Sequence, residues 1–527
     1  TLDNGLTVLV HEDHKTPIVA VNVWYHVGSK NEPEGRSGFA HLFEHLMFQG
    51  SENYEGEFFE PFQKVGATDQ NGTTSEDRTN YFQNVPSSAV DMALWMESDR
   101  MGHFIGSVTQ ELLDEQRGVV QNEKRQGLNQ PYGQVWELIP EYTYPKGHPY
   151  AHSVIGSMDD LDAASLDDVK AWFEAWYGPS NAVLALAGDI TVEEAREKVE
   201  LYFGDIEPGP PVSRPAPWVA KMPAPTRIAI PDEVPQARVY KVWNVPPYFH
   251  EDERRLELVR NILVGGKNSR LYRRLVYQDE LATSVGAFVA SGEIASQFFL
   301  IATARKGRAL ANVEAAIDEE LARLASEGPS ADELQRAKMA YFSSGVYGAE
   351  RIGGFGGKSD LLAQSQVLGG DPEAWVRGDA VIRSATGDEL VKTMTAWLDD
   401  GAFSLEVHPA EVFDAEPRVT DTPKRNATSE EGREGPEFVT DARGGALAAA
   451  AEGADRSEVP ATGTPPDLTL PEFQRTTLAN GLRVVLAERH EAPIVRMQLV
   501  MKGGGAADPA GRSGLANLTM RMLDEGT

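Results

Sequence analysis

The sequence predicts an α+β fold, on the basis of three observations. Runs rich in β-branched residues alternate with capped helix patterns in the N-terminal part of the chain. The same mixture resumes after a proline-rich break and continues over residues 228–407. The first 51 residues recur near the C-terminus without a gap. With 527 residues, the chain is long enough for roughly three domains.

The elements follow from local patterns. Strands are expected where β-branched and apolar residues cluster, at residues 6–10, 18–27, 79–85 and 181–187. Helices are expected at residues 37–49, 109–126 and 191–202, with Thr109 as an N-cap and Gly127 just beyond a C-terminus. Prolines at 208–217 mark a domain boundary, and the composition of residues 409–470 predicts a flexible linker. The resulting segments are 1–215, 225–408, 409–470 and 471–527.

The repeat pairs residue 1 with residue 477. Over the 51 aligned positions, 20 residues are identical. The frame of the first copy is kept in the second, but His41, Glu44 and His45 are replaced by Asn517, Met520 and Arg521. We interpret this as a duplicated half-molecule in which one copy has lost its polar residues, because a long period excludes a solenoid.

The three replaced residues belong to the motif His41-Leu-Phe-Glu44-His45. Histidines at i and i+4 share one face of a helix, at a spacing that lets two imidazoles hold one zinc ion. Glu44 lies near the same side, where a carboxylate can activate water. This is the inverted form of the better-known H-E-x-x-H motif.

A catalytic zinc ion takes three protein ligands and leaves one position open, so a third ligand is required. The helix expected over residues 109–126 supplies candidates. Gln116 and Glu123 share one of its faces, and Glu115 lies about 80° from Glu123 around the helix. We expect Glu123 to be the third ligand and keep Glu115 as the alternative.

Composition excludes several classes of function. A net charge of −31 argues against a nucleic-acid partner. The absence of cysteine excludes disulfides and thiolate ligands for zinc. No run of 18 apolar residues is present, so the sequence predicts no membrane span.

The segments GRSGFAHLFEHLMFQG (residues 35–50) and QRGVVQNE (residues 116–123) resemble the pitrilysin/insulinase family of inverted-motif zinc peptidases, which includes mitochondrial processing peptidase. The segment NQPYG (residues 129–133) makes the bacterial two-half members the most similar. The resemblance implies one Zn²⁺ ion held by His41, His45 and Glu123, with Glu44 as general base. Many members carry a glutamate at the position of Gln116, and Gln116 is expected to support a ligand histidine or carboxylate by a hydrogen bond.

The resemblance also implies an architecture. Each half should contain two sheet-plus-helices domains of the mitochondrial-processing-peptidase type, and two halves should close as a clamshell. Residues 1–215 are then the catalytic zinc-peptidase domain, residues 225–408 the non-catalytic second domain, and residues 471–527 the start of a degenerate second half. Extended peptide substrates should bind along an edge strand that carries Asn71, Gly72 and Thr73, unless these residues form an ordinary polar turn.

The resemblance leaves rival functions open. The chain could be a zinc metalloendopeptidase that acts on peptides or unfolded segments, a non-catalytic structural or partner subunit, or an inactive fragment that needs the rest of its second half. An exported or periplasmic location is expected, with a cytoplasmic one as the alternative. The glycine-rich run at residues 352–359 nearly fits a nucleotide-binding loop, but residue 352 is isoleucine where the first glycine is required. We interpret it as a flexible or tightly packed glycine loop of the second domain.

Overall fold

Two units make up the chain, residues Thr1–Leu470 and Pro471–Thr527. We analysed them in a computed structural model, which describes residues 1–398, 401–412, 436–441, 453–465, 467, 470–488, 490 and 494–523. In the described residues, no helix is both long and apolar enough to cross a membrane.

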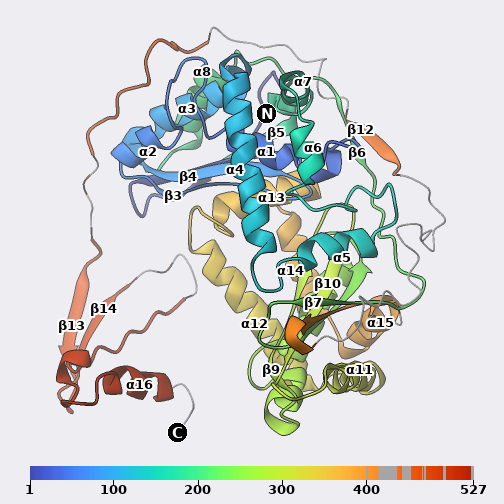
Figure 1. Cartoon of the computed structure of the whole chain (residues 1–527). Coiled ribbons are helices and arrows are strands. Elements are labelled where there is room, and N and C mark those ends of the chain that lie inside the picture. Colours follow the sequence, from blue (N-terminus) through green and yellow to red (C-terminus); the bar gives the residue numbers. More distant parts are fainter. Residues whose placement is uncertain are drawn as a thin grey trace. The chain divides into compact units, whose positions relative to one another are not determined.

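The first sheet of unit 1 has five strands in the order β1-β5-β2-β4-β3 (Figure 1). β1 and β5 are parallel, and the other neighbours are antiparallel. β3, at one end of this order, is an edge strand. The strands are β1 (Thr7–Glu12), β2 (Ile18–Tyr25), β3 (Thr68–Thr74), β4 (Thr79–Pro86) and β5 (Ala182–Gly188).

The second sheet repeats this topology, in the order β7-β11-β8-β10-β9. Its first strand is again parallel to its last, and the remaining pairs are antiparallel. Two domains of one mixed α+β design therefore lie in tandem, as the family resemblance predicted. The strands are β7 (Thr226–Asp232), β8 (Arg238–Val245), β9 (Ala282–Ala290), β10 (Ser296–Ala304) and β11 (Phe403–Pro409).

Helices pack against both sheets, and several begin as the sequence predicts. Thr109 accepts a hydrogen bond from the Leu112 amide, and Thr191 accepts one from the Glu194 amide. In the first domain the helices are α1 (Phe39–Leu46), α2 (Glu60–Lys64), α3 (Val90–Gly102), α4 (Gln110–Leu128), α5 (Val135–Thr143), α6 (Met158–Asp162), α7 (Leu166–Trp176) and α8 (Val192–Phe203). In the second they are α9 (Glu251–Val264), α10 (Arg270–Tyr272), α11 (Leu310–Glu327), α12 (Ala331–Ala349), α13 (Lys358–Gly369), α14 (Ala374–Ser384) and α15 (Gly387–Trp397).

Strand β2 is buried on both faces, because helices of two domains cover the sheet. Val21 and Val23 point into the core of the first domain. Trp24, on the opposite face, packs with Ala363 of α13, which lies across β2 and β5. Figure 1 shows α13 next to the first sheet although it belongs to the second domain. The family resemblance implies helices on one side of each sheet, but α13 covers the other face of the first sheet and α5 covers the other face of the second.

The glycine-rich run that precedes α13 packs tightly against the first domain. A Cβ atom on Gly353 would lie 2.0 Å from Oδ1 of Asn84 and 2.6 Å from Cβ of Ala20. Phe355 contacts Phe82 edge-on, with ring centroids 5.0 Å apart. Close packing therefore accounts for Gly353, while Gly354 and Gly356 have positive φ angles of 71° and 67° that favour glycine.

Parts of the range 409–470 are integral to unit 1. β6 (Val212–Pro215) pairs with β12 (Phe438–Asp441). Residues 453–463 lie over α3 and α8, where Ala454 and Val459 contact the core. The prediction of a flexible linker is therefore corrected for these stretches, while residues 413–435 and 442–452 lie outside the described residues.

Arg456 anchors residues 453–463. Its guanidinium donates to the carbonyls of Trp95 (3.3 Å) and Tyr202 (2.7 Å) and to the hydroxyl of Ser98 (2.8 Å). The Trp95 indole in turn donates to the carbonyl of Asp455. Only 12% of the Arg456 side chain is exposed, so these bonds form away from bulk water.

Unit 2 contains the hairpin β13 (Phe473–Thr477) and β14 (Arg483–Ala487), followed by α16 (Leu515–Met522). β14 and α16 align with β1 and α1 of unit 1, whereas residues 494–501, which align with β2, form no strand. Gly514, before α16, has φ 94°, and Gly38, before α1, has φ 93°. The clamshell arrangement concerns how two halves sit relative to each other, and it stays a prediction.

We expect Arg456→Ala to loosen residues 453–463. The loss of hydrogen bonds to a charged, mostly buried group costs about 1–3 kcal/mol, or about tenfold or more in local opening. Amide exchange measured by mass spectrometry should become faster in this stretch. Arg475→Ala, at an exposed position of β13, is the control and should leave it unchanged. Equal exchange in both variants would contradict the assigned role of Arg456.

Candidate active site

Helix α1 presents the motif because its apolar side is buried. Leu42, Phe43 and Leu46 point into the core of the first domain. His41 and His45, one turn apart, therefore share the side that faces α4, and their ring centroids are 4.8 Å apart. The side chains of both histidines remain partly accessible, with 18% and 17% exposed.

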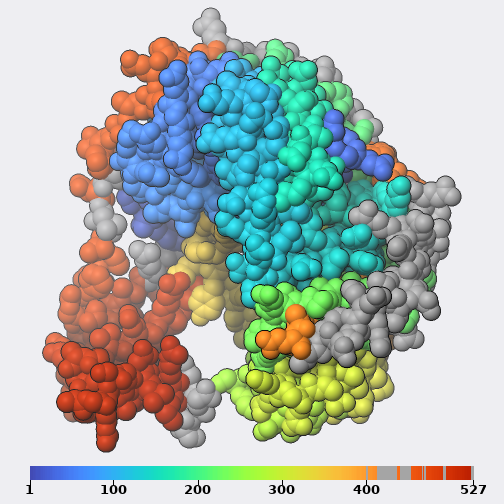
Figure 2. Space-filling model, viewed as in Figure 1, coloured from blue at the N-terminus to red at the C-terminus, as the bar shows by residue number. Residues whose placement is uncertain are grey.

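Glu123 of α4 completes the group. Its Oε2 lies 3.4 Å from Nε2 of His45 and 3.7 Å from Nε2 of His41. Among the described residues, these three form the one group whose ligand atoms could hold a metal ion, with every pair of those atoms within 4.8 Å. Glu115 is exposed and takes no part in this group. α4 runs along the surface of unit 1 (Figure 2), and Glu123 is half-exposed.

The electrostatics of the two histidines suit a metal. Burial, aided by the neighbouring His45, lowers the pKa of His41 to about 4. Burial also lowers the pKa of His45, against the opposing charge of Glu123. Both imidazoles are therefore neutral near pH 7, which is the form that binds metal.

Glu44 is buried beside the pair, with 7% of its surface exposed. Burial raises the pKa of Glu44 to about 7, although a hydrogen bond from Thr74 and the charge of Arg78 act in the opposite direction. The Thr74 hydroxyl donates to Oε2 at 2.6 Å, which links the end of β3 to α1. A carboxylate with this pKa can accept or release a proton near neutral pH.

The residues expected to contact substrate lie on edge strand β3, so they form a strand and not a polar turn. Asn71, Gly72 and Thr73 pair with β4, and the Thr73 carbonyl accepts a hydrogen bond from Arg78 at 2.7 Å. Gly72 sits where no side chain fits, because a Cβ atom would lie 2.5 Å from Cζ of Phe48.

Gln116 lies on the buried side of α4. Within the described residues, its amide makes no hydrogen bond to His41 or His45. Nδ1 of His41 is itself buried without a partner among those residues. The prediction that Gln116 supports a ligand by a hydrogen bond stays a prediction.

Sequence reasoning missed the supports of the site. Thr74 and Arg78 carry no motif, and only the pairing of β3 with β4 places them beside Glu44. Glu32, which accepts hydrogen bonds from amides at the start of α1, and its partner His152 were also missed. Glu32 aligns with the acidic Asp508 of the repeat. That alignment is the one signal in the sequence that pointed to an acid before α1.

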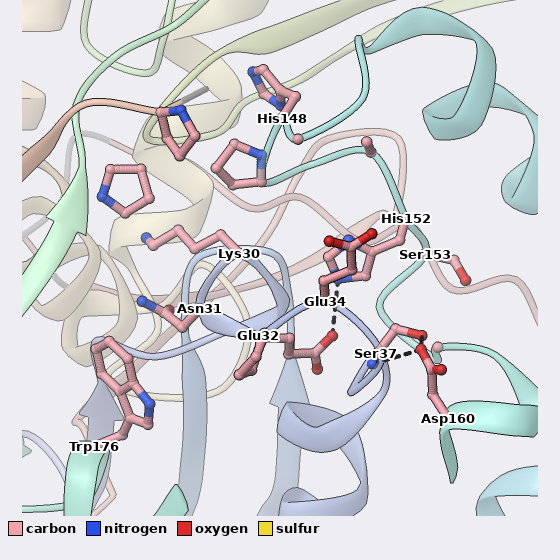
Figure 3. Close-up of a pocket in the computed structure, with 18 of the residues that line it drawn as sticks. Lys30, Asn31, Glu32, Glu34, Ser37, His148, His152, Ser153, Asp160 and Trp176 are labelled. Atoms are coloured by element: carbon pink, nitrogen blue, oxygen red, sulfur yellow. Dashed lines mark hydrogen bonds and ion pairs between the residues drawn. The ribbon is translucent and has the colours of Figure 1, made fainter. Parts of the chain in front are cut away.

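A cavity of about 860 Å³ lies elsewhere in unit 1 (Figure 3). It is bordered by the loop after β2, the segment around His148 and His152, and prolines near residue 211. None of His41, Glu44, His45 and Glu123 lines it. The candidate metal site and this cavity are therefore separate features.

Comparison with known families agrees with this fold and geometry. The model of the insulinase family (peptidase family M16) matches residues 7–156, and the model of the peptidase M16 inactive domain matches residues 163–341. The first match contains both histidines and both glutamates of the site, and the second match covers residues without the motif. The chain belongs to the insulinase family, peptidase family M16.

Individual relatives are bacterial proteins named as zinc proteases. Zinc protease PqqE of Helicobacter pylori is 29% identical over 377 residues, which span 70% of this chain and 84% of that protein. Probable zinc protease PqqL of Escherichia coli is 27% identical over 64% of this chain and 37% of its own length.

Solved structures share the fold. A Helicobacter pylori protease superposes with a TM-score of 0.72 at 25% identity, over 78% of this chain and 98% of that one. The Escherichia coli periplasmic protease PqqL gives a TM-score of 0.64 at 19% identity, over 93% of this chain and 55% of that one. The first half of PqqL alone matches 78% of this chain.

We expect Gly72→Ala to destabilise the protein by about 1–3 kcal/mol, the usual cost of overpacking. The new methyl group would meet Phe48 and Tyr81. The matched control is Gly118→Ala in α4, where nothing lies within 4 Å, and it should stabilise by about 0.5–1 kcal/mol. Urea unfolding of both variants measures the difference. A neutral Gly72→Ala would show that β3 can shift freely.

Proposed function

We propose that this chain is the catalytic part of a zinc-dependent endopeptidase. The single observation that carries the proposal is the convergence of His41, His45 and Glu123, with the buried carboxylate of Glu44 beside them. Relatives of this chain are named zinc proteases, which supports both the metal and the reaction class.

The donor set fits zinc. Two neutral imidazoles and one carboxylate are a common ligand set of catalytic zinc sites, and they leave a coordination position open. We propose one Zn²⁺ ion per chain, with His41, His45 and Glu123 as its ligands. When bound, zinc supplies Lewis acidity that acidifies water and polarises a carbonyl group.

Glu44 is the proposed general base. It takes a proton from the attacking water and later delivers that proton to the amine of the leaving group. Its burial favours both transfers, because a pKa near 7 holds the carboxyl close to balance between its two forms. The hydrogen bond from Thr74 fixes the orientation of the carboxyl while it does so.

Edge strand β3 is the proposed site for the substrate backbone. An extended peptide that pairs with an exposed edge gains main-chain hydrogen bonds with little dependence on its sequence. Asn71, Gly72 and Thr73 lie on this edge, and Thr74 at its end contacts Glu44. A peptide along β3 would therefore reach the general base.

The proposal extends to partner and location. Residues aligned with the motif helix recur in unit 2 without the motif, and the full PqqL protein is longer than this chain. We propose that a motif-less second half, in the same or another polypeptide, completes the enzyme. PqqL is described as periplasmic, and we propose an exported location here too. The intact motif argues against a purely structural subunit.

We expect Glu44→Gln to retain zinc and to lose about 10²–10⁴-fold in kcat for a quenched peptide, since it removes proton transfer and leaves the ligands in place. Glu115→Gln, an exposed carboxylate on α4, is the matched control and should keep full activity. Wild-type turnover by Glu44→Gln would refute the assignment of the base.

We expect His41→Ala and Glu123→Ala each to weaken zinc binding by more than about 100-fold, because loss of a ligand exceeds the 10–100-fold effect of an outer-shell change. Metal content after dialysis against a weak chelator measures this. His14→Ala, an exposed histidine on the first domain, should bind zinc normally. Normal metal content in Glu123→Ala would contradict its assignment as a ligand.

A further inference from the structure

The chain entering helix α1 is held by two carboxylates from outside the helix. Gly38 precedes α1 in a left-handed conformation and has no side chain to cap it. Glu32 accepts hydrogen bonds from the Gly38 amide (2.9 Å) and the Ala40 amide (2.8 Å) instead. Asp160 accepts from the amide and the hydroxyl of Ser37. The Glu32 bonds satisfy amides at the start of the helix that carries the motif, and the Asp160 bonds hold the residue before it.

Glu32 is fully buried, and a buried carboxylate needs a compensating partner. His152 provides it, with Nε2 2.9 Å from Oε2 of Glu32 (Figure 3). Burial raises the pKa of Glu32, while the hydrogen bond and charge of His152 act against that rise. The two side chains are 120 positions apart in the sequence and meet only in the folded domain.

His152 can exchange its proton with solvent. Its side chain is 29% exposed and borders the 860 Å³ cavity. Burial opposes protonation of His152, but the hydrogen bond and charge of Glu32 outweigh it, so the pKa of His152 is raised. The ionisable groups that act on it most closely are acidic: Glu32, Glu76 and Asp160. Other charged or ionisable groups around the cavity are Lys30, Glu34, Glu137, Glu141, Lys146 and His148.

Unit 2 supplies an internal comparison. Asp508, aligned with Glu32, caps α16 in the same way by accepting from the amides of Gly514 (2.6 Å) and Ala516 (2.8 Å). Asp508 is only partly buried. The carboxylate cap therefore belongs to the frame that the two copies share.

We propose that charged His152 is a positioning residue of this peptidase: it keeps Glu32 ionised, and Glu32 in turn fixes the start of α1, and with it the placement of His41 and Glu44. The inference rests on the proposed function. It assigns a role to two residues that lie outside the metal site and contact neither the ligands nor the base.

The pair gives the enzyme a defined pH response. Because Glu32 raises the pKa of His152 above its ordinary value, the cation extends to higher pH than that of a free histidine. The pair is lost in acid, where Glu32 becomes protonated, and the stabilising effect of the cation is lost as the pH rises through the raised pKa of His152. Above that pH, Glu32 loses its counter-charge and its grip on the first turn of α1 weakens, so kcat should fall.

The test compares kcat and KM of the zinc-loaded full chain, from about pH 6 to about pH 10, with His152→Arg and His152→Gln. Arginine stays charged throughout this range, so its variant should retain kcat at alkaline pH where the wild type declines. Glutamine carries no charge, so its variant should lose about tenfold in kcat where wild-type His152 is charged, and approach the wild-type value at alkaline pH, with KM nearly unchanged. His14→Gln, which removes an exposed histidine that also pairs with a carboxylate, should follow the wild-type profile.

Amide exchange at residues 38–42 reports the same cap without turnover. It should become faster in His152→Gln and Glu32→Gln and stay near the wild-type rate in His152→Arg. Superimposable pH profiles for wild type and His152→Arg, or unchanged exchange in His152→Gln, would overturn the inference. Absence of peptide cleavage by zinc-loaded wild type would instead refute the proposed function, and the exchange measurement would still decide the role of His152.

Discussion

The packing of α1 against α4 is the contact on which the site depends. Leu42 and Leu46 of α1 and Leu113 and Val120 of α4 enter one core. This fixes the rotation of both helices, so that the polar side of α1 faces Glu123. Zinc–ligand bonds are only about 2 Å long, so a shift of either helix by one turn would move the donor atoms too far apart to bind one ion.

The burial of acidic side chains around α1 is electrostatically unfavourable, and different partners compensate Glu97 and Glu32. Glu97 pairs with Arg100, which also donates to the Met47 carbonyl at the C-terminal end of α1. Glu32 serves the N-terminal end with His152. Both ends of the motif helix are therefore held by charged groups, and Glu44 between them keeps its raised pKa. A rigid frame of this kind suits a site whose parts must be placed within fractions of an ångström.

Much of the fold followed from local patterns, and the failures have physical reasons. β2 and β5 were predicted from their β-branched and apolar runs, and α4 and α8 from their caps. β3 was left open because its sequence, TDQNGTT, is polar, and only pairing with β4 makes it a strand. Residues 453–463 have the composition of a linker, yet hydrogen bonds from Arg456 to α3 and α8 hold them in place. Composition indicates how much apolar surface a segment can bury by itself, but not which contacts another part of the fold provides for it.

The sequence by itself determined that two histidines and a glutamate share one helix side and that a second copy of their frame lacks them. It predicted Glu123 as the third ligand with Glu115 as the alternative, and the packing of α4 brings Glu123 to the histidines. It could not reveal the Glu32–His152 pair, or the covering of β2 by α13. Periodicity is a property of neighbouring residues, whereas ligand geometry and buried ion pairs depend on contacts between distant segments that exist only after the chain has folded.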